Sequence, residues 1–242
     1  MDVKDKLAVV TGGARRVGRA IAQVLAGEGA RVVIHCHESR EEAEGLARQV
    51  GGRVVQADLT QAAGAHALAG QVLELVDGGE ELAVWVNAAA RFERRLFLES
   101  DDPLWQETLQ LVLLSPAAAL RRVAPRMIDG GVIINVLDVA AHRAWKGFAH
   151  HSVAKAALLM LTRSLALELA PRLRVCGVSP GVVLLSEDPP EGEGERLLRR
   201  VPLKRLGDPA DVADAVRFLV GADYVTGSIV TVDGGLTARL LD

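Results

Sequence analysis

The sequence contains very little tyrosine, asparagine and cysteine for a chain of 242 residues. There is one tyrosine, there are two cysteines, and aromatic residues together make up 3% of the chain. Cys36 and Cys176 fall in predicted strands far apart in the sequence, so we expect both to be small buried apolar side chains. Such sparing use of cysteine fits a reducing cytoplasm.

Long hydrophobic runs and a strong excess of charge are also missing. Half of the residues are hydrophobic, yet none of the apolar runs is long enough to span a bilayer. The N-terminus has no long apolar stretch after a basic start, so a secretory signal is not expected. The net charge of -3 gives no electrostatic reason to bind nucleic acid or an anionic membrane. We therefore expect a cytoplasmic protein that acts on a small molecule.

Apolar runs alternate with helical patterns along the whole chain. The runs are continuous rather than alternating, which is typical of strands buried on both faces. They lie at 7–11, 31–36, 53–57, 82–87, 131–137, 173–179 and 228–234, with helical segments around 18–29, 39–50, 61–77, 101–128, 148–170 and 208–220. This repetition predicts one α/β domain over 1–242, a doubly wound Rossmann-type fold with a seven-stranded parallel sheet flanked by helices.

The stretch 186–200 interrupts the pattern with prolines, glycines and charges. It predicts a loop followed by a short amphipathic helix. Two interpretations are open: a solvated charged insertion, or a lid over a substrate cleft.

The first strand runs into T-G-G-A-R-R-V-G at 11–18 and then into a helix. Glycines at such a turn let a phosphate approach the backbone at a helix N-terminus, where N–H groups and the helix dipole favour anions. We therefore predict a dinucleotide phosphate site here.

The end of the second strand favours NADP(H) over NAD(H). NAD-binding proteins usually carry an acidic residue there to hold the ribose hydroxyls, whereas this chain has His35 and Cys36. Donors for a 2′-phosphate follow or lie nearby, since the neighbourhood contains Arg15, His37, Ser39 and Arg40. The negative charge of Glu38 argues against a phosphate site. The alternative interpretation is that His37 and Arg40 belong to a solvent-exposed helix start.

A second cluster of polar residues follows the fifth strand. Asp138 ends that strand, and the segment G-F-A-H-H-S-V-A-K at 147–155 places His151 four residues before Lys155. Positions four apart share a helix face, so both side chains are expected to point into one cleft. Imidazole exchanges its proton near neutral pH and can act as a general acid.

These motifs resemble the short-chain dehydrogenase/reductase family across essentially the whole chain. The turn is similar to TGxxxGxG with Arg16 in the middle glycine's place, and S-P-G-V at 179–182 and YVTGSIVTVDGG at 224–235 also match. The family has serine, tyrosine and lysine at the spacing of Asp138, His151 and Lys155. The resemblance implies that the second group moves the substrate proton, while the lysine binds the nicotinamide ribose.

The chain is most similar to the pteridine reductase subgroup. That subgroup shares the arginine in the turn, an H-x-H-x-S string after the second strand, aspartate in place of the serine, and a phenylalanine matched here by Phe92. The resemblance implies that Arg16 and Phe92 hold the substrate, with the Phe92 ring stacking it against the nicotinamide. A singly packed hydrophobic side chain is the alternative for Phe92.

The resemblance implies a cofactor site built from the loops after the first, second, third, fourth and sixth strands and from Lys155. An aspartate in the place of Asp58 contacts the adenine amino group in the family, although Asp58 or Thr60 capping the next helix is an equal alternative. Asn87 matches the first asparagine of the family motif NNAG, whose second asparagine and glycine are alanines in this chain. The predicted cofactor ligands are Thr11, Gly12, Arg15, Arg16, Val17, Gly18, His37, Ser39, Arg40, Asp58, Leu59, Asn87, Lys155, Pro180, Gly181 and Val183.

Two departures from the family bear on catalysis. His151 stands where the family has tyrosine, and Val112 replaces a helix asparagine that holds a water in the family's proton relay. Imidazole is shorter than phenol, so its reach to a substrate differs. His151 is thus either a working proton donor or a side chain that merely packs.

Three hypotheses follow. The first is an NADP(H)-dependent reductase of a C=N or C=O bond, pteridine-reductase-like. The second is an NADP-binding oligomer that no longer turns over substrate. The third is a 3-oxoacyl carrier protein reductase, with a basic patch from Arg91, Arg94 and Arg95. The wide apolar surface of 152–170 predicts self-association to a dimer or tetramer.

Overall fold

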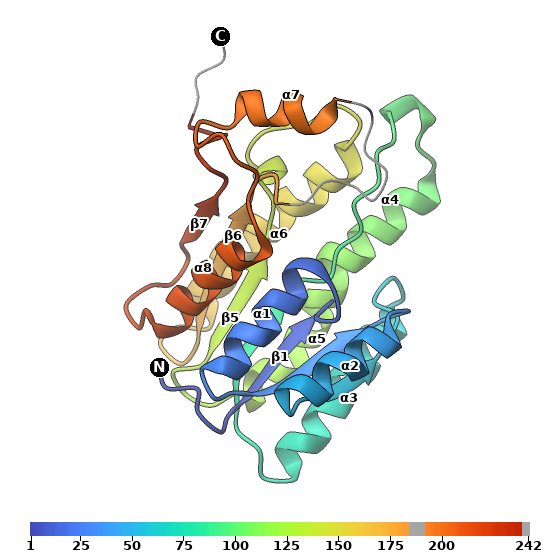
Figure 1. Cartoon of the computed structure of the whole chain (residues 1–242). Helices are drawn as coiled ribbons and strands as arrows, with labels where there is room; N and C mark the ends of the chain where they lie inside the picture. Colours follow the sequence, from blue (N-terminus) through green and yellow to red (C-terminus); the bar gives the residue numbers. More distant parts are fainter. Residues whose placement is uncertain (184–191, 239–242) are drawn as a thin grey trace.

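One parallel sheet forms the centre of the computed structural model, which describes residues 1–183 and 192–238 (Figure 1). Its strands are β1 (Leu7–Thr11), β2 (Arg31–Cys36), β3 (Arg53–Gln56), β4 (Leu82–Asn87), β5 (Val132–Val136), β6 (Arg174–Pro180) and β7 (Ile229–Val232). They lie in the order β3-β2-β1-β4-β5-β6-β7. This is the doubly wound order. All strands run parallel, and the direction in which strands are added to the sheet reverses between β1 and β4.

Helices cover both faces of this sheet. They are α1 (Arg16–Gly27), α2 (Arg40–Val50), α3 (Ala62–Asp77), α4 (Asp102–Leu109), α5 (Ser115–Val123), α6 (Ala149–Glu168), α7 (Glu193–Arg200) and α8 (Pro209–Gly221). Short helical turns are η1 (Phe97–Glu99), η2 (Gln110–Leu114), η3 (Ala124–Arg126) and η4 (Val139–Ala141). Among the helices of the described ranges, none is both long and apolar enough to cross a bilayer.

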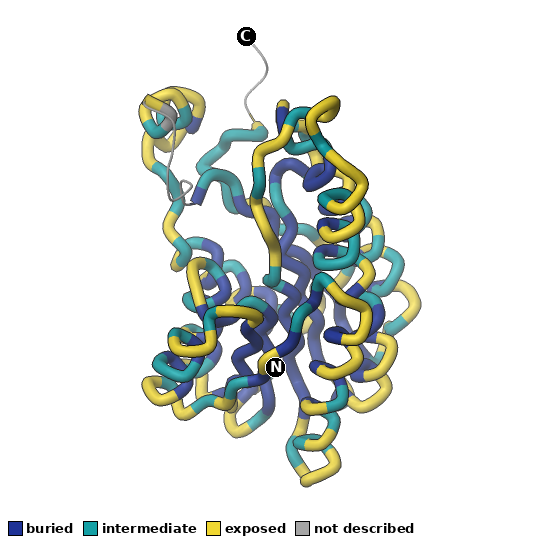
Figure 2. The backbone as a smooth tube through the Cα atoms, turned by 90° about the vertical axis from the view of Figure 1, so that its right-hand side faces the viewer, coloured by how far each residue is buried: buried dark blue, intermediate teal, exposed yellow. Residues whose placement is uncertain are grey.

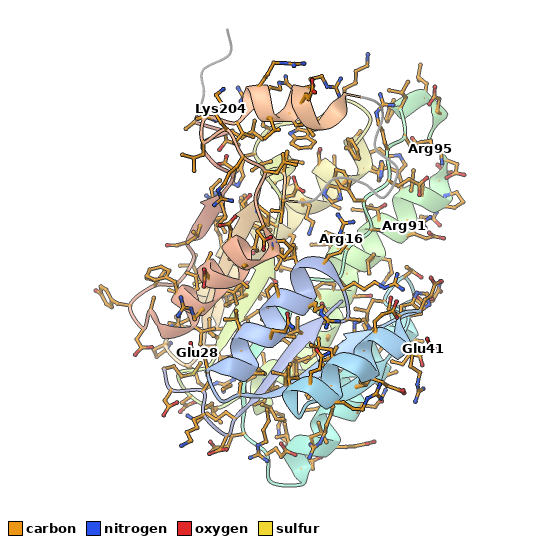
Figure 3. All side chains as sticks on the ribbon, viewed as in Figure 1. Arg16, Glu28, Glu41, Arg91, Arg95 and Lys204 are labelled. Atoms are coloured by element: carbon orange, nitrogen blue, oxygen red, sulfur yellow. The ribbon has the colours of Figure 1, made fainter. Side chains whose placement is uncertain are left out.

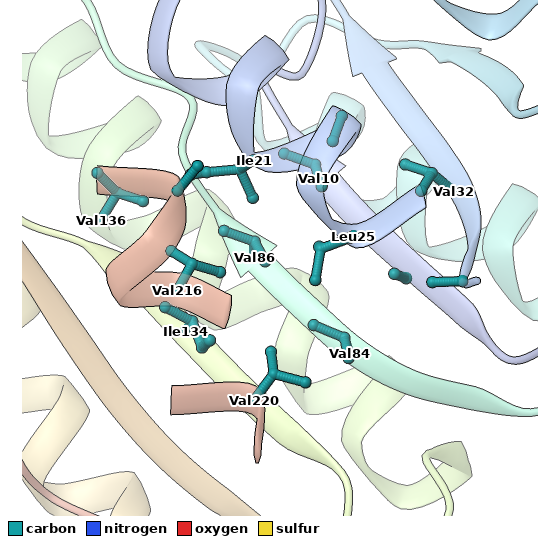
Figure 4. Packing of buried hydrophobic residues seen from close by; sticks show 14 of the residues in the cluster. Val10, Ile21, Leu25, Val32, Val84, Val86, Ile134, Val136, Val216 and Val220 are labelled. Atoms are coloured by element: carbon teal, nitrogen blue, oxygen red, sulfur yellow. The ribbon is translucent and has the colours of Figure 1, made fainter. Parts of the chain in front are cut away.

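The core has one layer on each side of the sheet. On one side α1, α2 and α8 pack against alternate strand residues such as Val10, Ile34 and Val86 (Figure 4). On the other side α3, α5 and α6 pack against the intervening residues, including Val9 and Trp85. Figure 2 shows the buried strands at the centre and the exposed residues along the outer helices. The strands are buried on both faces, as their continuous apolar runs predict.

The parallel register brings the carboxyl ends of the central strands into one row. Thr11 pairs with Asn87, and Asn87 pairs with Asn135 on the next strand. In open parallel sheets, ligands bind at this edge, near the point where the strand order reverses. The loops that carry the predicted site residues all leave the sheet here.

The sequence prediction of the fold is confirmed, with one local difference. The segment 101–128 is not one helix, because α4 and α5 are joined through the π-helical turn η2. Within it the Ser115 N–H donates to the Gln110 carbonyl, five residues back. Pro116 has no N–H to continue the regular ladder, and proline is a common cause of such a break.

The predicted helix after the charged stretch is present as α7. Residues 184–191 lie outside the described part of the chain, and with them the first six residues of the segment 186–200 that was predicted to be a lid or a solvated insertion. Both predicted buried cysteines, Cys36 and Cys176, are free thiols in the core.

Candidate active site

The turn between β1 and α1 is shaped by two close backbone approaches. Gly12 has a φ of +63°, and a Cβ there would lie 2.9 Å from the Cα of Ala89. A Cβ on Gly18 would lie 2.1 Å from the Gly12 carbonyl oxygen. Glycine is therefore required at both positions, and the start of α1 packs directly onto the end of β1.

Arg16 keeps the backbone shape of the glycine that it replaces in the family pattern. Its φ is +51°, in the left-handed region that costs a residue with a Cβ roughly 1 kcal/mol. Figure 3 shows Arg16 at the start of α1, at the edge of the sheet where the central strands end. A charged side chain held there against a backbone cost is typical of a functional position.

The N-terminus of α1 fits a bound pyrophosphate. No side chain caps this helix end, and its first turn carries no acidic residue. The first-turn N–H groups of a helix have no partner within the helix, and the helix dipole favours an anion beside them. Arg15, Arg16 and Arg19 surround this end with positive charge.

The side chain of His35, on β2, forms a hydrogen bond with the glycine turn. The Gly12 N–H donates to its Nδ1 at 3.1 Å, and its Nε2 lies 3.0 Å from the Ala57 carbonyl oxygen. Burial is the main cause that lowers the pKa of His35 to about 4. His35 and Cys36 are each 2% exposed, so neither takes the ribose-binding place of an acidic residue.

The predicted 2′-phosphate donors gather at the end of β2, where acidic partners hold them. Arg15 forms an ion pair with Glu42, and Arg40 donates to Glu44 at 2.8 Å. The His37 Nε2 lies 3.9 Å from the Asp58 carboxylate. These pairs are solvent-exposed and worth little, so a bound phosphate can compete for the cations.

Asp58 does not cap the following helix. Its Oδ1 accepts from the Thr60 N–H at 2.9 Å and from the Thr60 hydroxyl at 2.6 Å, bonds that contribute to lowering its pKa although burial opposes them. The N-cap of α3 is Gln61, whose side chain makes no capping bond. The capping alternative is therefore wrong for both Asp58 and Thr60.

Three predicted cofactor ligands have side chains committed to the protein interior. The Thr11 hydroxyl accepts from the N–H groups of Ala88 and Ala89 at 3.0 and 3.1 Å. Leu59 packs in the core between the sheet and α3. These side chains shape the site from behind, so the cofactor contacts predicted for these residues fall to their backbone groups.

The side chain of Asn87 is the third of these. Its Oδ1 accepts from the Trp85 indole N–H and its Nδ2 donates to Asn135, both at 2.8 Å. Asn135 in turn donates to Thr162 on α6 at 2.8 Å. The two asparagines of the sequence thus form one buried chain of hydrogen bonds that ties β4 and β5 to α6, because buried amides require partners.

The three predicted reaction residues meet at the end of β5. The Asp138 Oδ2 lies 3.5 Å from the His151 Nε2, and the Lys155 Nζ donates to the Val136 carbonyl at 2.6 Å. Asp138 also accepts from the Ala140 N–H at 2.7 Å, which fixes the carboxylate at the start of η4. Of the neighbouring histidines, His151 is the one that faces this carboxylate.

Lys155 is a buried cation. It is 3% exposed, and desolvation lowers its pKa to about 8 although the Asp138 charge raises it. Burial destabilises a charged ammonium unless hydrogen bonds and opposite charge offset the loss of water.

His151 has the properties of an enclosed polar group. The ring is 2% exposed, and neither of its nitrogens has a hydrogen-bond partner among the described residues. Unpaired buried polar groups are rare in proteins and concentrate at functional sites. Val112 lies in an apolar cluster with Leu137 and Leu158, so it offers no polar group for a relay water.

Five of the eight aromatic side chains of the sequence gather beside this trio. Phe92 stacks on Phe148 with ring centroids 4.3 Å apart and contacts the edge of His151 at 5.1 Å. Trp145 lies against Phe148, and Trp105 against His150. Phe92 is 53% exposed, so this aromatic wall contacts the His151 ring on one side and opens to solvent on the other.

The turn after β6 provides the remaining predicted ligands. The Gly181 N–H donates to the Val232 carbonyl, and the Gly207 N–H to the Val182 carbonyl, each at 2.9 Å. Pro180 and Val183 are buried. These contacts place the turn at the same edge of the sheet as Asp138.

Comparison with known proteins places the chain in a family. A family profile described as enoyl-(acyl carrier protein) reductase matches residues 12–237. An uncharacterised oxidoreductase of Mycobacterium tuberculosis is 34% identical, with 98% of this chain and 94% of that protein covered. The 3-oxoacyl-[acyl-carrier-protein] reductase FabG of Staphylococcus epidermidis is 30% identical, with coverages of 96% and 99%.

A solved structure is similar over the same length. FolM alternative dihydrofolate reductase 1 from Brucella canis, complexed with NADP, superposes with a TM-score of 0.89 at 31% identity, covering 100% of this chain and 97% of that one. The chain belongs to the short-chain dehydrogenase/reductase family. The expected oxidoreductase class and fold are thereby confirmed.

Two features of the site were not recognised in the sequence. The role of His35 was missed, although a polar residue inside the apolar run RVVIHC was a visible signal. Phe148 and Trp145 were also missed, although Phe148 is the N-cap residue of α6 and lies only three residues before His151.

Burial of Lys155 leads to a stability prediction. The pKa in the folded protein, about 8, is below the ordinary 10.5, so the unfolded chain binds the extra proton between these values. Stability should rise with pH across this window and carry a cost below it of up to about 3 kcal/mol. We expect Lys155→Met to be at least as stable as the wild type at pH 7.

Urea unfolding of both proteins from pH 7 to pH 10 measures this effect. The advantage of Lys155→Met should shrink as pH rises through 8, because the wild-type lysine then loses its charge. If Lys155→Met is less stable than the wild type, and by the same amount at pH 7 and at pH 10, the assignment of a buried, destabilising charge is wrong.

Proposed function

We propose that this protein is an NADP(H)-dependent reductase that transfers hydride to a C=N or C=O bond of a small, flat substrate, similar to a pteridine reductase. The observation that carries the proposal is the convergence of Asp138, His151 and Lys155 beneath an aromatic wall. The similarity to FolM, which is complexed with NADP, supports both the cofactor and the substrate class.

The cofactor, when bound, supplies the hydride. Arg16 and the start of α1 hold its pyrophosphate, and Arg15, His37, Ser39 and Arg40 hold the 2′-phosphate once the exposed ion pairs open. Lys155 donates from its ammonium group to ribose hydroxyls at the end of β5. Because burial lowers the pKa of Lys155, this group sits close to the pH range in which it can also pass a proton.

The proton that accompanies the hydride comes from the Asp138–His151 pair in this proposal. The carboxylate oxygen Oδ2 and the imidazole Nε2 are 3.5 Å apart, and the imidazole ring contacts Phe92. A proton on His151 Nε2 is shared toward Asp138 or donated to the substrate nitrogen or oxygen. The reduced bond then carries one hydrogen from the cofactor and one from this pair, which is refilled from solvent.

The substrate is expected to lie flat against Phe92. The exposed face of this ring offers stacking area to a planar heterocycle, and Phe148 supports the other side of the ring. Arg16 supplies donors toward carbonyl oxygens of such a substrate.

Reduction of a carrier-bound 3-oxoacyl group is the second candidate, favoured by the FabG relatives. It requires a basic surface near the cleft. Arg91 and Arg95 lie on the loop after β4 (Figure 3), yet Glu93 pairs with both of them. Glu93 lowers the positive charge of this loop, which makes it less suited to an acidic carrier.

The test is a substrate panel run beside a binding measurement. We expect NADP⁺ to bind in calorimetry, and NADPH to be oxidised with dihydrobiopterin or dihydrofolate faster than with simple ketones or a carrier-bound 3-oxoacyl thioester. Preference for the thioester would favour the second candidate. Binding of NADP⁺ without oxidation by any member of the panel would overturn the reductase proposal and favour a binding protein.

Substitution of His151→Tyr tests the proton donor. The proposal predicts a gain of about 10-fold or more in kcat, because a phenol reaches further toward the substrate than imidazole and suits the family's lysine. His150→Tyr is the matched control, since that ring faces Trp105 rather than Asp138, and no gain is expected. Equal or lower activity in His151→Tyr, with NADP⁺ still bound, would contradict the expectation that the short reach of the imidazole limits the rate.

Self-association is expected through α6. Val153, Met160 and Leu167 are 50%, 57% and 84% exposed, and their seven-residue spacing places them along one stripe of the helix. An apolar stripe of this kind is typical of an interface between protein chains. The dimer or tetramer of the sequence prediction would cover it.

Met160→Asp should shift the protein toward smaller species in sedimentation velocity at micromolar concentration. A charge buried in an apolar interface is costly, and a drop in association of 10-fold or more (about 1.4 kcal/mol) is expected. Ala67→Asp, at an exposed position of α3, is the control and should leave the assembly intact. An unchanged assembly in Met160→Asp would exclude this stripe as the interface.

A further inference from the structure

The ring of His35 makes two hydrogen bonds that demand one chemical form. The Gly12 N–H is a donor, so Nδ1 must present a lone pair. The Ala57 carbonyl is an acceptor, so Nε2 must carry the hydrogen. Only the neutral ring protonated at Nε2 satisfies both partners. A protonated ring would turn Nδ1 into a donor aimed at another donor.

The backbone of the same residue holds the next amide of the turn. The Gly13 N–H donates to the His35 carbonyl at 2.9 Å. His35 therefore binds two successive amides of the glycine turn, one through its side chain and one through its main chain. The contact with Ala57 extends this bracing to the end of β3, next to Asp58.

These hydrogen bonds fix the backbone conformation of the glycine turn. With the Gly12 and Gly13 amides held by His35, the backbone turns at Gly12 against Ala89 and leads into α1. The uncapped N-terminus of α1 is the part proposed above to receive the pyrophosphate.

We propose that His35 is a positioning residue for dinucleotide binding, which holds the glycine turn in its binding shape through its neutral, Nε2-protonated ring. The role rests on the proposed NADP(H) function. His35 touches no part of the cofactor in this proposal, and it acts through the backbone of Gly12 and Gly13.

The surroundings keep the ring in this form. Burial lowers the pKa of His35 to about 4, the bond to Ala57 opposes this shift, and the nearby His37 adds to it. His37 itself faces the Asp58 carboxylate at 3.9 Å. The ring is thus neutral throughout the range in which exposed histidines gain their charge.

Nitrogen-15 NMR of histidines in the apoprotein tests the ring form directly. From pH 7.5 to pH 5, His35 should keep the signals of a neutral ring protonated at Nε2. A His35 ring protonated at Nδ1, or one that gains a second proton within this pH range, would overturn the proposal whether or not the protein binds a dinucleotide.

Calorimetric NADP⁺ binding by three variants tests the consequence. His35→Leu removes both ring hydrogen bonds and should weaken binding roughly 10-fold or more. His35→Asn keeps one acceptor and one donor and should recover part of the loss. His66→Asn makes the same replacement on the remote surface of α3 and should bind as the wild type does.

The outcomes separate the two proposals. Unchanged NADP⁺ affinity in a folded His35→Leu would overturn the positioning role alone. Absence of NADP⁺ binding by the wild type would overturn the proposed function and this role with it. If His35→Leu does not fold, equal affinity of His35→Asn and wild type from pH 8 to pH 5, combined with a titrating ring, still overturns the role.

Discussion

The parallel arrangement of the seven strands is the constraint on which the site depends. Because every strand runs the same way, all carboxyl ends lie at one edge, and the turns that follow them converge there. The glycine turn, Asp58, Asp138 and the Gly181 turn come from four different strands and lie along the same edge of the sheet for this reason. The buried bonds between Asn87, Asn135 and Thr162 hold β5 and α6 together just behind the reaction residues.

Several buried titratable groups lie at the site, although burying such groups usually lowers the stability of a folded protein. Lys155 is desolvated, His35 is held neutral, and the His151 ring has no hydrogen-bond partner within the described chain. The buried lysine and the unsatisfied imidazole cost folding free energy, and Arg16 adds a backbone cost. Perturbed and unsatisfied groups gathered in one place are characteristic of sites selected for chemistry. The aromatic wall beside them gives this chemistry a flat face, which fits the substrate class we propose.

Much of the fold was readable from local patterns. Continuous apolar runs separated by helical segments predicted the strands and the parallel sheet, because burial on both faces leaves no alternation. The four-residue step from His151 to Lys155 and the place of Asp138 after a strand predicted that they meet. The break at η2 was missed, since a helical pattern shows periodicity and not the hydrogen bond that Pro116 removes. The inward direction of Asn87, Thr11 and Leu59 was also missed, because a motif gives a residue's position along a strand end but not the partner of its side chain.

The sequence by itself determined the family, the order of strands and helices, and which chemical groups stand at the strand ends. These follow from composition, spacing and motif, all of which are local along the chain. Which of these groups face the site and which brace it is set by contacts between distant segments: His35 binds the glycine turn, Glu93 pairs with Arg91 and Arg95, and Phe92 packs against His151. The physical reason is that hydrogen bonds, ion pairs and ring contacts between distant segments depend on distances of a few ångströms, and these are set by the packing of the whole core.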